Sequence, residues 1–352
     1  MTTMTPGKLW GLRRLADDAG RFKMLAVDQR PPIKDLVKAA RGTAEASYND
    51  VADVKRLLVE ELAPYSTAAL LDPHYAYPTA IDAVSPHRGL LLTLEDSVFE
   101  ETATGRRSAE IEDWSVDKIR RVGADAVKVL AWYRPDADEE INEHQRRFVA
   151  RIGEACRRYD IPYLFELLVY SFPDEDNHSS GYVEQTAKRA DHVIESVETF
   201  ADAVYGIDVF KLESPIPAPE IPDPHGEDTA AIDRTQELFD QMDRASCVPW
   251  VMLSAGAEKD AFLRILTYAY RSGASGFLAG RAIWWDEVQE FPDLARARRS
   301  LRATSVPYME RISDLTDELA LPFVQHSSFG STGPEPADRS ASFRANYGSI
   351  NR

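Results

Sequence analysis

Eight short apolar runs, spread over the first 280 residues, constrain the fold of this chain more than any other feature. The predicted strands are Phe22 to Asp28, Ala68 to Asp72, Gly89 to Leu94, Ala124 to Leu130, Pro162 to Leu168, Ile207 to Glu213, Pro249 to Ala255 and Ala274 to Gly280. Polar residues interrupt most of these runs only rarely, which is typical of strands buried on both faces. The pattern therefore predicts a parallel sheet.

Amphipathic segments lie between these runs and predict helices. One apolar stripe comprises Val51, Val54, Leu57, Leu58 and Leu62, and another comprises Phe262, Ile265, Leu266 and Ala269. We expect Ser115 to cap a short helix that ends near Gly123, and Gly273 to follow the helix that carries the second stripe. Eight strand and helix repeats favour a closed (β/α)8 TIM barrel over an open sheet.

The chain has 352 residues, and a barrel with additions commonly forms one domain of that size. We expect residues 1–325 to form a single (β/α)8 barrel domain. Residues 326–352 are rich in Ser, Gly, Pro and Arg and show little periodicity, so they predict a C-terminal extension. This tail would be either mobile or wrapped around a neighbouring subunit.

Charge and cysteine content narrow the possible partners and the location. A formal net charge of −17 argues against nucleic acid and anionic membranes, because both attract basic surfaces. The two cysteines, Cys156 and Cys247, form no disulfide or zinc-binding pattern. We find neither a signal peptide nor a run of 18 apolar residues, so we expect a cytoplasmic protein.

Two lysines lie within predicted strands, where a charge is costly unless it has a purpose. Lys211 lies between Phe210 and Leu212, and Lys128 lies in the run ADAVKVL. Burial and a second cation would favour the neutral amine of Lys211, the form that attacks a carbonyl to make a Schiff base. The alternative for each lysine is a structural ion pair. For Lys211 the partner would be Glu166, Glu213 or another barrel carboxylate, and for Lys128 it would be Glu166.

Two carboxylates are candidates for proton transfer. Glu166 has apolar neighbours in PYLFELLV, which we expect to raise its pKa towards a value useful to an acid and base, unless it only balances a lysine. Asp28 is either a base or hydroxyl-orienting group, or the cap of a loop. We favour a functional role because Gln29 and Arg30 follow it directly at a strand end.

Glycine-containing turns after the last two strands predict a phosphate site. Ser254, Ala255 and Gly256 follow the seventh strand, and Gly280 and Arg281 follow the eighth. Arg30 would add a positive charge at the other end of a long substrate, and Glu95, after the third strand, is a further candidate for substrate binding.

Two other mechanisms compete with the Schiff base. A zinc enzyme would need several histidines at strand ends, but of the seven histidines in the chain only His74 lies at one. A magnesium enzyme could use the carboxylates of Asp72, Glu95, Glu166 and Glu213. The lysines within strands favour the imine, and we expect neither a metal nor an organic cofactor. A non-catalytic barrel that binds a sugar phosphate is the third reading, against which Lys211 and Glu166 argue.

Ordered motifs along the chain resemble the class I tagatose 1,6-bisphosphate aldolase family over about residues 10 to 320. The motifs are LAVDQR (25–30), LLDPHY (71–76), WSVDKIRRVGADAVKVL (114–130), FELL (165–168), VFKLESP (209–215), LSAG (253–256) and GFLAGRA (276–282). The resemblance implies a Schiff base on Lys211 and proton transfer by Glu166. It also implies a substrate site lined by Asp28, Gln29, Arg30, Lys128, Ser254, Gly256, Gly280 and Arg281.

The same resemblance implies the reaction. The substrate would be a ketose 1-phosphate, namely tagatose 1,6-bisphosphate and also fructose 1,6-bisphosphate. Its cleavage would give dihydroxyacetone phosphate and an aldehyde such as glyceraldehyde 3-phosphate. A related family cleaves 6-deoxy-6-sulfofructose 1-phosphate to 3-sulfolactaldehyde, and its LAVDQR and GASGFLAGRA motifs are similar. The chain departs from the family at Ser171 to Tyr182, at Arg134 to Glu140 and beyond Leu321, which leaves the far group of the sugar open.

The resemblance also implies a homo-oligomer. Five apolar residues would either form its interface or cover the barrel: Trp284, Trp285, Ile312, Leu315 and Leu319.

Overall fold

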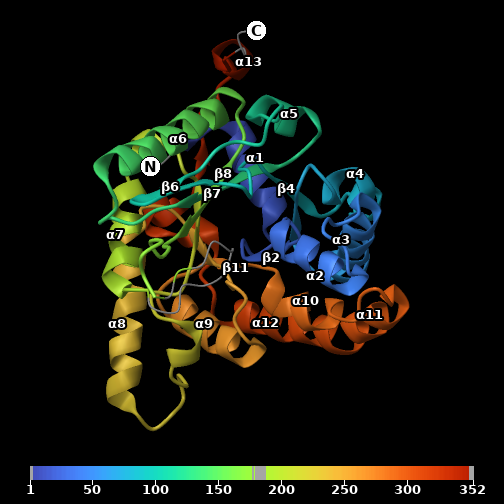
Figure 1. Ribbon diagram of the computed structural model, residues 1–352. Coiled ribbons are helices and arrows are strands. Elements are labelled where there is room, and N and C mark those ends of the chain that lie inside the picture. Colours follow the sequence, from blue (N-terminus) through green and yellow to red (C-terminus); the bar gives the residue numbers. More distant parts are fainter. Residues whose placement is uncertain (1–2, 177, 179–187, 349–352) are drawn as a thin grey trace.

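The computed structural model describes residues 3–176, 178 and 188–348, and its centre is a closed barrel of parallel strands (Figure 1). The barrel strands, in order around the barrel, are β2 (Phe22–Ala26), β3 (Ala68–Leu71), β4 (Gly89–Thr93), β7 (Ala126–Trp132), β8 (Tyr163–Leu168), β9 (Val209–Leu212), β10 (Trp250–Met252) and β11 (Gly276–Ala279). Each lies within a predicted run or overlaps it. The (β/α)8 prediction is therefore confirmed.

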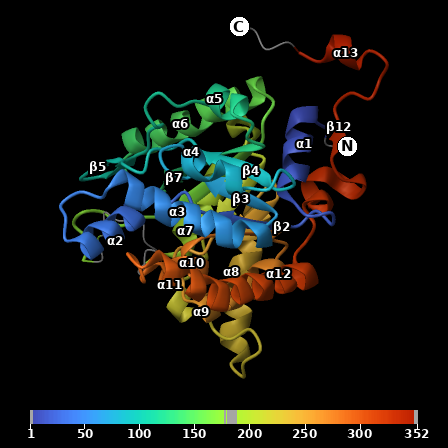
Figure 2. The same cartoon turned by 90° about the vertical axis from the view of Figure 1, so that its right-hand side faces the viewer.

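Helices surround this barrel and follow the strands along the chain (Figures 1 and 2). They are α2 (Pro31–Arg41), α3 (Tyr48–Leu62), α4 (Ala76–Ala80), α5 (Val116–Arg121), α6 (Glu139–Arg158), α7 (Ala190–Phe200), α8 (Thr229–Ala245), α9 (Lys259–Arg271), α10 (Arg281–Val288), α11 (Leu294–Ser300) and α12 (Val306–Leu319). Both predicted stripes lie on helices, α3 and α9, and Ser115 caps α5 by accepting the Lys118 N–H.

The two larger apolar clusters of the described residues stabilise the barrel. One lies between strands and outer helices, and it includes Trp284 and Ile312, both fully buried. Trp284 also donates from Nε1 to the Ala26 carbonyl at 3.1 Å, so this residue covers the barrel and is not part of an exposed interface. The other fills the barrel interior with small and branched side chains, including Ala26, Leu70 and Leu91.

The amino end of the barrel is closed by segments from both chain ends. Helix α1 (Pro6–Leu15) contributes Leu12 and Leu15 to the interior cluster, and Phe323 stacks on Phe22 with ring centroids 5.2 Å apart. Apolar side chains therefore fill the interior at the amino end of the barrel.

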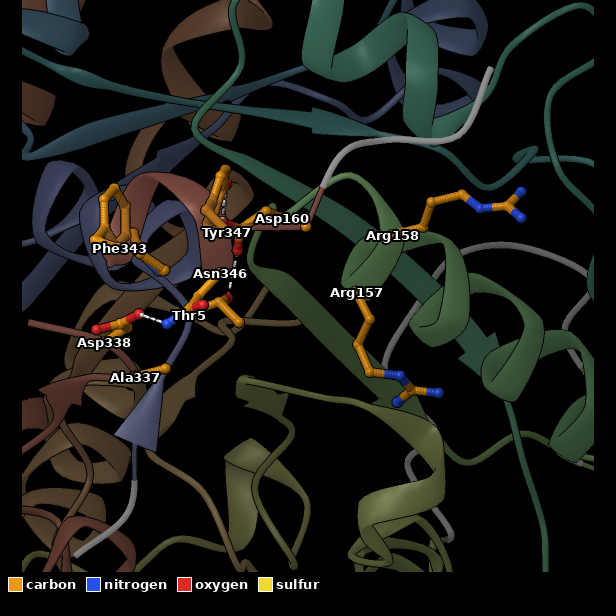
Figure 3. Close-up of a pocket in the computed structure, with 11 residues that line it drawn as sticks. Thr5, Arg157, Arg158, Asp160, Ala337, Asp338, Phe343, Asn346 and Tyr347 are labelled. Atoms are coloured by element: carbon orange, nitrogen blue, oxygen red, sulfur yellow. Dashed lines mark hydrogen bonds between the residues drawn. The ribbon is translucent and has the colours of Figure 1, made fainter. Parts of the chain in front are cut away.

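The C-terminal residues lie against the amino terminus of the same chain. Strand β12 (Glu335–Pro336) pairs in parallel with β1 (Thr3–Met4). Beyond it, α13 (Phe343–Asn346) leads to Tyr347, whose hydroxyl donates to Asp160 beside Thr5 (Figure 3). Arg157 and Arg158, from the end of α6, line the same surface pocket (Figure 3).

A short antiparallel hairpin, β5 (Glu100–Thr102) and β6 (Gly105–Arg107), was not predicted. Its Arg106 is almost fully buried, with the guanidinium 4.5 Å from the ring centre of Phe99 and 4.6 Å from that of Trp132. This stacking fixes the hairpin beside the carboxyl end of β7.

Candidate active site

Alternation along the strands carries charged side chains into the barrel above its apolar layer. On β7, Lys128 is two residues beyond the interior residue Ala126, and on β8, Glu166 is two residues beyond Leu164. Successive side chains of a strand point to opposite faces, so each charged residue faces inward like its apolar predecessor. Lys211 follows Val209 on β9 in the same way.

Glu166 lies between the two strand lysines and contacts both. Its Oε2 is 2.9 Å from the Lys211 Nζ and 2.7 Å from the Lys128 Nζ. All three side chains are at most 5% exposed. The predicted pairing of these residues is thus present, and the lysines share one carboxylate oxygen.

Two further carboxylates complete the cluster around Lys128. Its Nζ lies 3.0 Å from Asp28 Oδ2 and 2.6 Å from Glu95 Oε1. The other oxygen of Glu95 accepts a hydrogen bond from the Thr93 hydroxyl at 2.5 Å. Lys128 is therefore held by three acids, whereas Lys211 forms one ion pair with the described residues, to Glu166. This difference leaves Lys211 the less constrained amine.

The lysines decide the ionisation of the buried acids. Burial would raise the pKa of Asp28, but the charges of Lys128 and Lys211 outweigh it and lower that pKa to about 2. The pKa of Glu166 is also lowered, because the same two lysines outweigh the effect of its burial. Our prediction of a raised Glu166 pKa was wrong, since its neighbours along β8 are apolar but the two adjacent strands, β7 and β9, each place a lysine beside it.

Glu213 and Asp72 have other partners than those predicted. Glu213 accepts the Val169 N–H at 2.7 Å and pairs with Lys188 at 3.0 Å, so the carboxylate of Lys211 is Glu166. Asp72 pairs with Lys55 at 2.5 Å. Of the four candidate magnesium ligands, Asp72 and Glu213 therefore pair with separate lysines, whereas Glu95 and Glu166 share Lys128.

The zinc and magnesium alternatives both need a group of metal ligands that lie close together. In the described ranges, no group of three or more His, Cys, Asp and Glu side chains is arranged to hold a metal ion. His74, the strand-end histidine, donates its backbone N–H to Asp72 at 3.0 Å.

The turns after β10 and β11 lie together, as predicted for a phosphate site. Ala255 and Gly256 have positive φ angles of 48° and 88°, and Arg281 donates from Nη2 to the Ala255 carbonyl at 3.3 Å. A Cβ on Gly280 would lie 2.7 Å from the Ala26 carbonyl oxygen, so only glycine permits this approach to β2. Ser254, just before this turn, is buried.

Gln29 and Arg30 present buried polar atoms to a pocket at the barrel mouth, which Asp28, Glu95, Lys128 and Trp132 also line. Arg30 donates from Nη2 to the Glu95 carbonyl at 3.0 Å. Its Nε and Nη1, and the Gln29 Oε1, are buried without a hydrogen-bond partner among the described residues. Such unsatisfied groups fit a polar ligand.

Sequence reasoning missed Lys55, Thr93 and Lys188. Lys55 had a detectable pattern, because it occupies the apolar face of α3 four residues after Val51 and three before Leu58. Lys188 lies just after residues 179–187, which are outside the described part, so residues 177 and 179–182 of the predicted loop from Ser171 to Tyr182 are outside it as well. Nothing in its local sequence indicates a partner.

Fold and site together define a class: a parallel barrel in which a buried lysine contacts a carboxylate and a second lysine lies beside it, an arrangement suited to a Schiff-base lyase. Comparison with known proteins agrees with this class. Residues 22–286 match the model of the DeoC/LacD family aldolases. The chain belongs to this family.

Individual relatives narrow the match. The chain is 35% identical to the tagatose 1,6-diphosphate aldolase of Listeria monocytogenes, over 94% of this chain and 97% of that protein. It is 34% identical to tagatose 1,6-diphosphate aldolase 1 of Streptococcus mutans, over 88% and 96%. The chain thus belongs with these proteins to the tagatose 1,6-bisphosphate aldolase family.

Solved structures support the fold. A fructose-bisphosphate aldolase from Plasmodium falciparum, 13% identical, aligns with a TM-score of 0.61 over 91% of this chain and 98% of that chain. An archaeal fructose 1,6-bisphosphate aldolase, 17% identical, aligns with a TM-score of 0.51 over 83% of this chain and 97% of that chain.

Among the described residues, no helix is long and apolar enough to cross a membrane.

Proposed function

We propose that this protein is a class I aldolase that cleaves tagatose 1,6-bisphosphate, and also fructose 1,6-bisphosphate, to dihydroxyacetone phosphate and glyceraldehyde 3-phosphate. The observation that carries this proposal is the Lys128–Glu166–Lys211 chain of contacts at 2.7 and 2.9 Å inside the barrel. The names of the relatives support the choice of substrate.

The first step is attack of Lys211 on the C2 carbonyl of the ketose. The ammonium of Lys211 must first lose a proton, and the carboxylate of Glu166 at 2.9 Å is placed to accept it. Addition gives a carbinolamine, and Glu166 returns the proton as the hydroxyl leaves as water. The resulting protonated imine is an electron sink.

Carbon–carbon cleavage follows from this sink. Glu166 removes the proton of the C4 hydroxyl, the C3–C4 bond breaks, and its electron pair forms an enamine with the imine carbon. Protonation at C3 and hydrolysis release dihydroxyacetone phosphate. Asp28, with its pKa lowered to about 2, stays ionised at neutral pH and serves to orient Lys128 and substrate hydroxyls.

The two ends of the substrate meet different groups. The turn of Ser254, Ala255 and Gly256, together with Gly280 and Arg281, would hold the C1 phosphate with backbone N–H groups and one guanidinium. At the other end, the unpartnered Nε and Nη1 of Arg30 and the Gln29 amide would receive the far group. A sulfonate at that end, as in 6-deoxy-6-sulfofructose 1-phosphate, is the competing substrate.

Borohydride trapping tests the proposal. The protein is incubated with dihydroxyacetone phosphate in the presence of EDTA, reduced, and analysed by intact mass and peptide mapping. We expect one adduct, on Lys211, and none in Lys211→Met. An adduct on Lys128 would reassign the nucleophile, and cleavage that EDTA abolishes without any adduct would contradict the imine mechanism.

We further propose that the protein works as a cytoplasmic homo-oligomer, with residues 1–325 as its one domain. Both cysteines are free, Cys156 buried and Cys247 exposed, which fits a reducing compartment. Sedimentation of the purified chain measures the assembly state directly.

A further inference from the structure

A further buried lysine, Lys55, supports the site from outside the barrel. The Lys55 side chain, on α3, is fully buried and donates from Nζ to two acceptors at the ends of neighbouring strands. One is the Val27 carbonyl at 2.6 Å, and the other is Asp72 Oδ2 at 2.5 Å. Val27 is the residue directly before Asp28, so this bond fixes the backbone that carries a site carboxylate.

Both acceptors of Lys55 are themselves held rigidly. The Val27 N–H donates to the Leu70 carbonyl at 2.9 Å, so this residue is anchored on both its peptide groups. Asp72 accepts the N–H groups of His74 at 3.0 Å and Tyr75 at 2.8 Å with its other oxygen. Lys55 therefore joins two fixed points.

Stability alone gives little reason for this lysine. Its place on α3 belongs to the apolar face of Val51, Leu58 and Leu62. A buried ion pair is often no more stabilising than apolar residues of similar volume. An apolar side chain, however, cannot donate a directional hydrogen bond to the carbonyl before Asp28.

We propose that Lys55 is a positioning residue, which holds the Val27–Asp28 backbone so that Asp28 keeps Lys128 aligned with Glu166 and Lys211. The inference rests on the proposed function and deepens it. The contact of Asp28 with Lys128 is 3.0 Å, long for a charge-assisted hydrogen bond, so a small backbone shift would break it and let Lys128 move towards Glu95 and Glu166. Misplacement of a catalytic group by about 1 Å can reduce turnover roughly 100-fold.

The test compares two lysines with the same local chemistry. Lys55→Met removes the bond to Val27, and Lys8→Met is the matched control. Lys8 is also buried and also contacts one carboxylate, Asp208 at 2.7 Å, and one carbonyl, Gly206 at 3.3 Å, but at the amino end of the barrel. We expect Lys55→Met to lower kcat roughly 10- to 100-fold with KM changed less than about threefold. Lys8→Met should leave kcat of the folded protein unchanged.

A double-mutant cycle separates positioning from general loosening. If Lys55 acts through Asp28, Lys55→Met should change the residual kcat of Asp28→Asn by less than about threefold. The same factor of loss in both backgrounds, or a wild-type kcat in folded Lys55→Met, would overturn the inference. Asp72→Asn, which frees Lys55 without removing it, provides a second variant if Lys55→Met does not fold. Its loss should likewise vanish in the Asp28→Asn background.

The outcomes are distinct from those for the proposed function. A wild type that cleaves the bisphosphate without an adduct on Lys211 contradicts the imine mechanism, and the kcat ratios above still decide the role of Lys55.

Discussion

The two ends of the barrel each bury lysines and carboxylates, but in different proportions. At the amino end, Lys8 pairs with Asp208, which also accepts the Tyr163 N–H at 2.8 Å. At the carboxyl end, Lys128 contacts three carboxylates and shares one of them with Lys211. The lysine and carboxylate at the amino end form a single pair, whereas at the carboxyl end a proton can pass between two lysines through the carboxylate that they share.

The acids at the two ends respond oppositely to burial. Burial raises the pKa of Asp208, and the single charge of Lys8 does not offset it. Asp28 is buried as well, yet Lys128 and Lys211 lower its pKa to about 2. A buried lysine alone thus does not mark a catalytic site. A second lysine that shares its carboxylate is the more informative feature.

The largest expected difference between the ends is in turnover. Lys211→Met should lower kcat by on the order of 10⁴-fold, because the nucleophile is removed. Its fold should persist, since methionine has a similar volume. A continuous assay coupled to dihydroxyacetone phosphate measures this loss, and Lys8→Met is the reference. Equal losses in the two variants would mean that Lys211 is structural.

The next effect should appear in stability at the amino end. Lys8→Met leaves Asp208 buried without its cation, which should lower the free energy of unfolding by roughly 3 to 5 kcal/mol. Urea unfolding at neutral pH measures the change. Lys8→Met/Asp208→Leu replaces the whole pair by apolar groups and should recover much of the loss. No recovery would show that the pair does more than balance its own charges.

Glu166→Gln should lower kcat by about 100-fold, because it keeps the side-chain shape and removes the proton acceptor. The reduced adduct on Lys211 should still form, but more slowly, since Lys211 must then lose its proton to solvent. Rapid-quench trapping measures both rates. An unchanged rate of adduct formation would assign the proton transfer to another group.

The architecture was readable from sequence because it follows from repeated local patterns. All eight barrel strands were predicted, since uninterrupted apolar runs require burial on both faces. The hairpin β5–β6 was missed, because its strands are short and polar and it is held by the stacking of Arg106 on distant rings such as Trp132. Only tertiary contact reveals that segment.

The residues of the site were predicted more completely than the contacts between them. Lys211, Lys128, Glu166 and Asp28 do come together. The pairs of Glu166 with Lys211 and Lys128 were among the predicted alternatives. The contacts of Lys128 with Asp28 and Glu95, and the direction of the Glu166 pKa shift, were not readable, because they depend on charges from other strands. Glu213 lies two residues from Lys211 yet pairs with Lys188, which precedes another helix.

The smallest expected effect is the pH dependence of stability, and its sign differs between the ends. The pKa of Asp28 falls from 3.8 to about 2 on folding, so its ionised form stabilises the fold above pH 3.8. This contribution, about 2 kcal/mol at neutral pH, is lost as the pH falls from about 4 to about 2. The pKa of Asp208 is raised, so its ionisation costs stability at neutral pH, and acid removes that cost.

Two variants separate these signs. Urea unfolding at pH 5, 4 and 3 is compared for the wild type, Asp28→Asn and Asp208→Asn. The advantage of the wild type over Asp28→Asn should shrink by about 1 kcal/mol between pH 5 and 3, whereas its stability relative to Asp208→Asn should rise over the same interval. Parallel curves for all three proteins would mean that neither carboxylate has the environment described. A fall against both variants would place Asp208, like Asp28, under the control of its lysine, and the contrast between the two ends of the barrel would disappear.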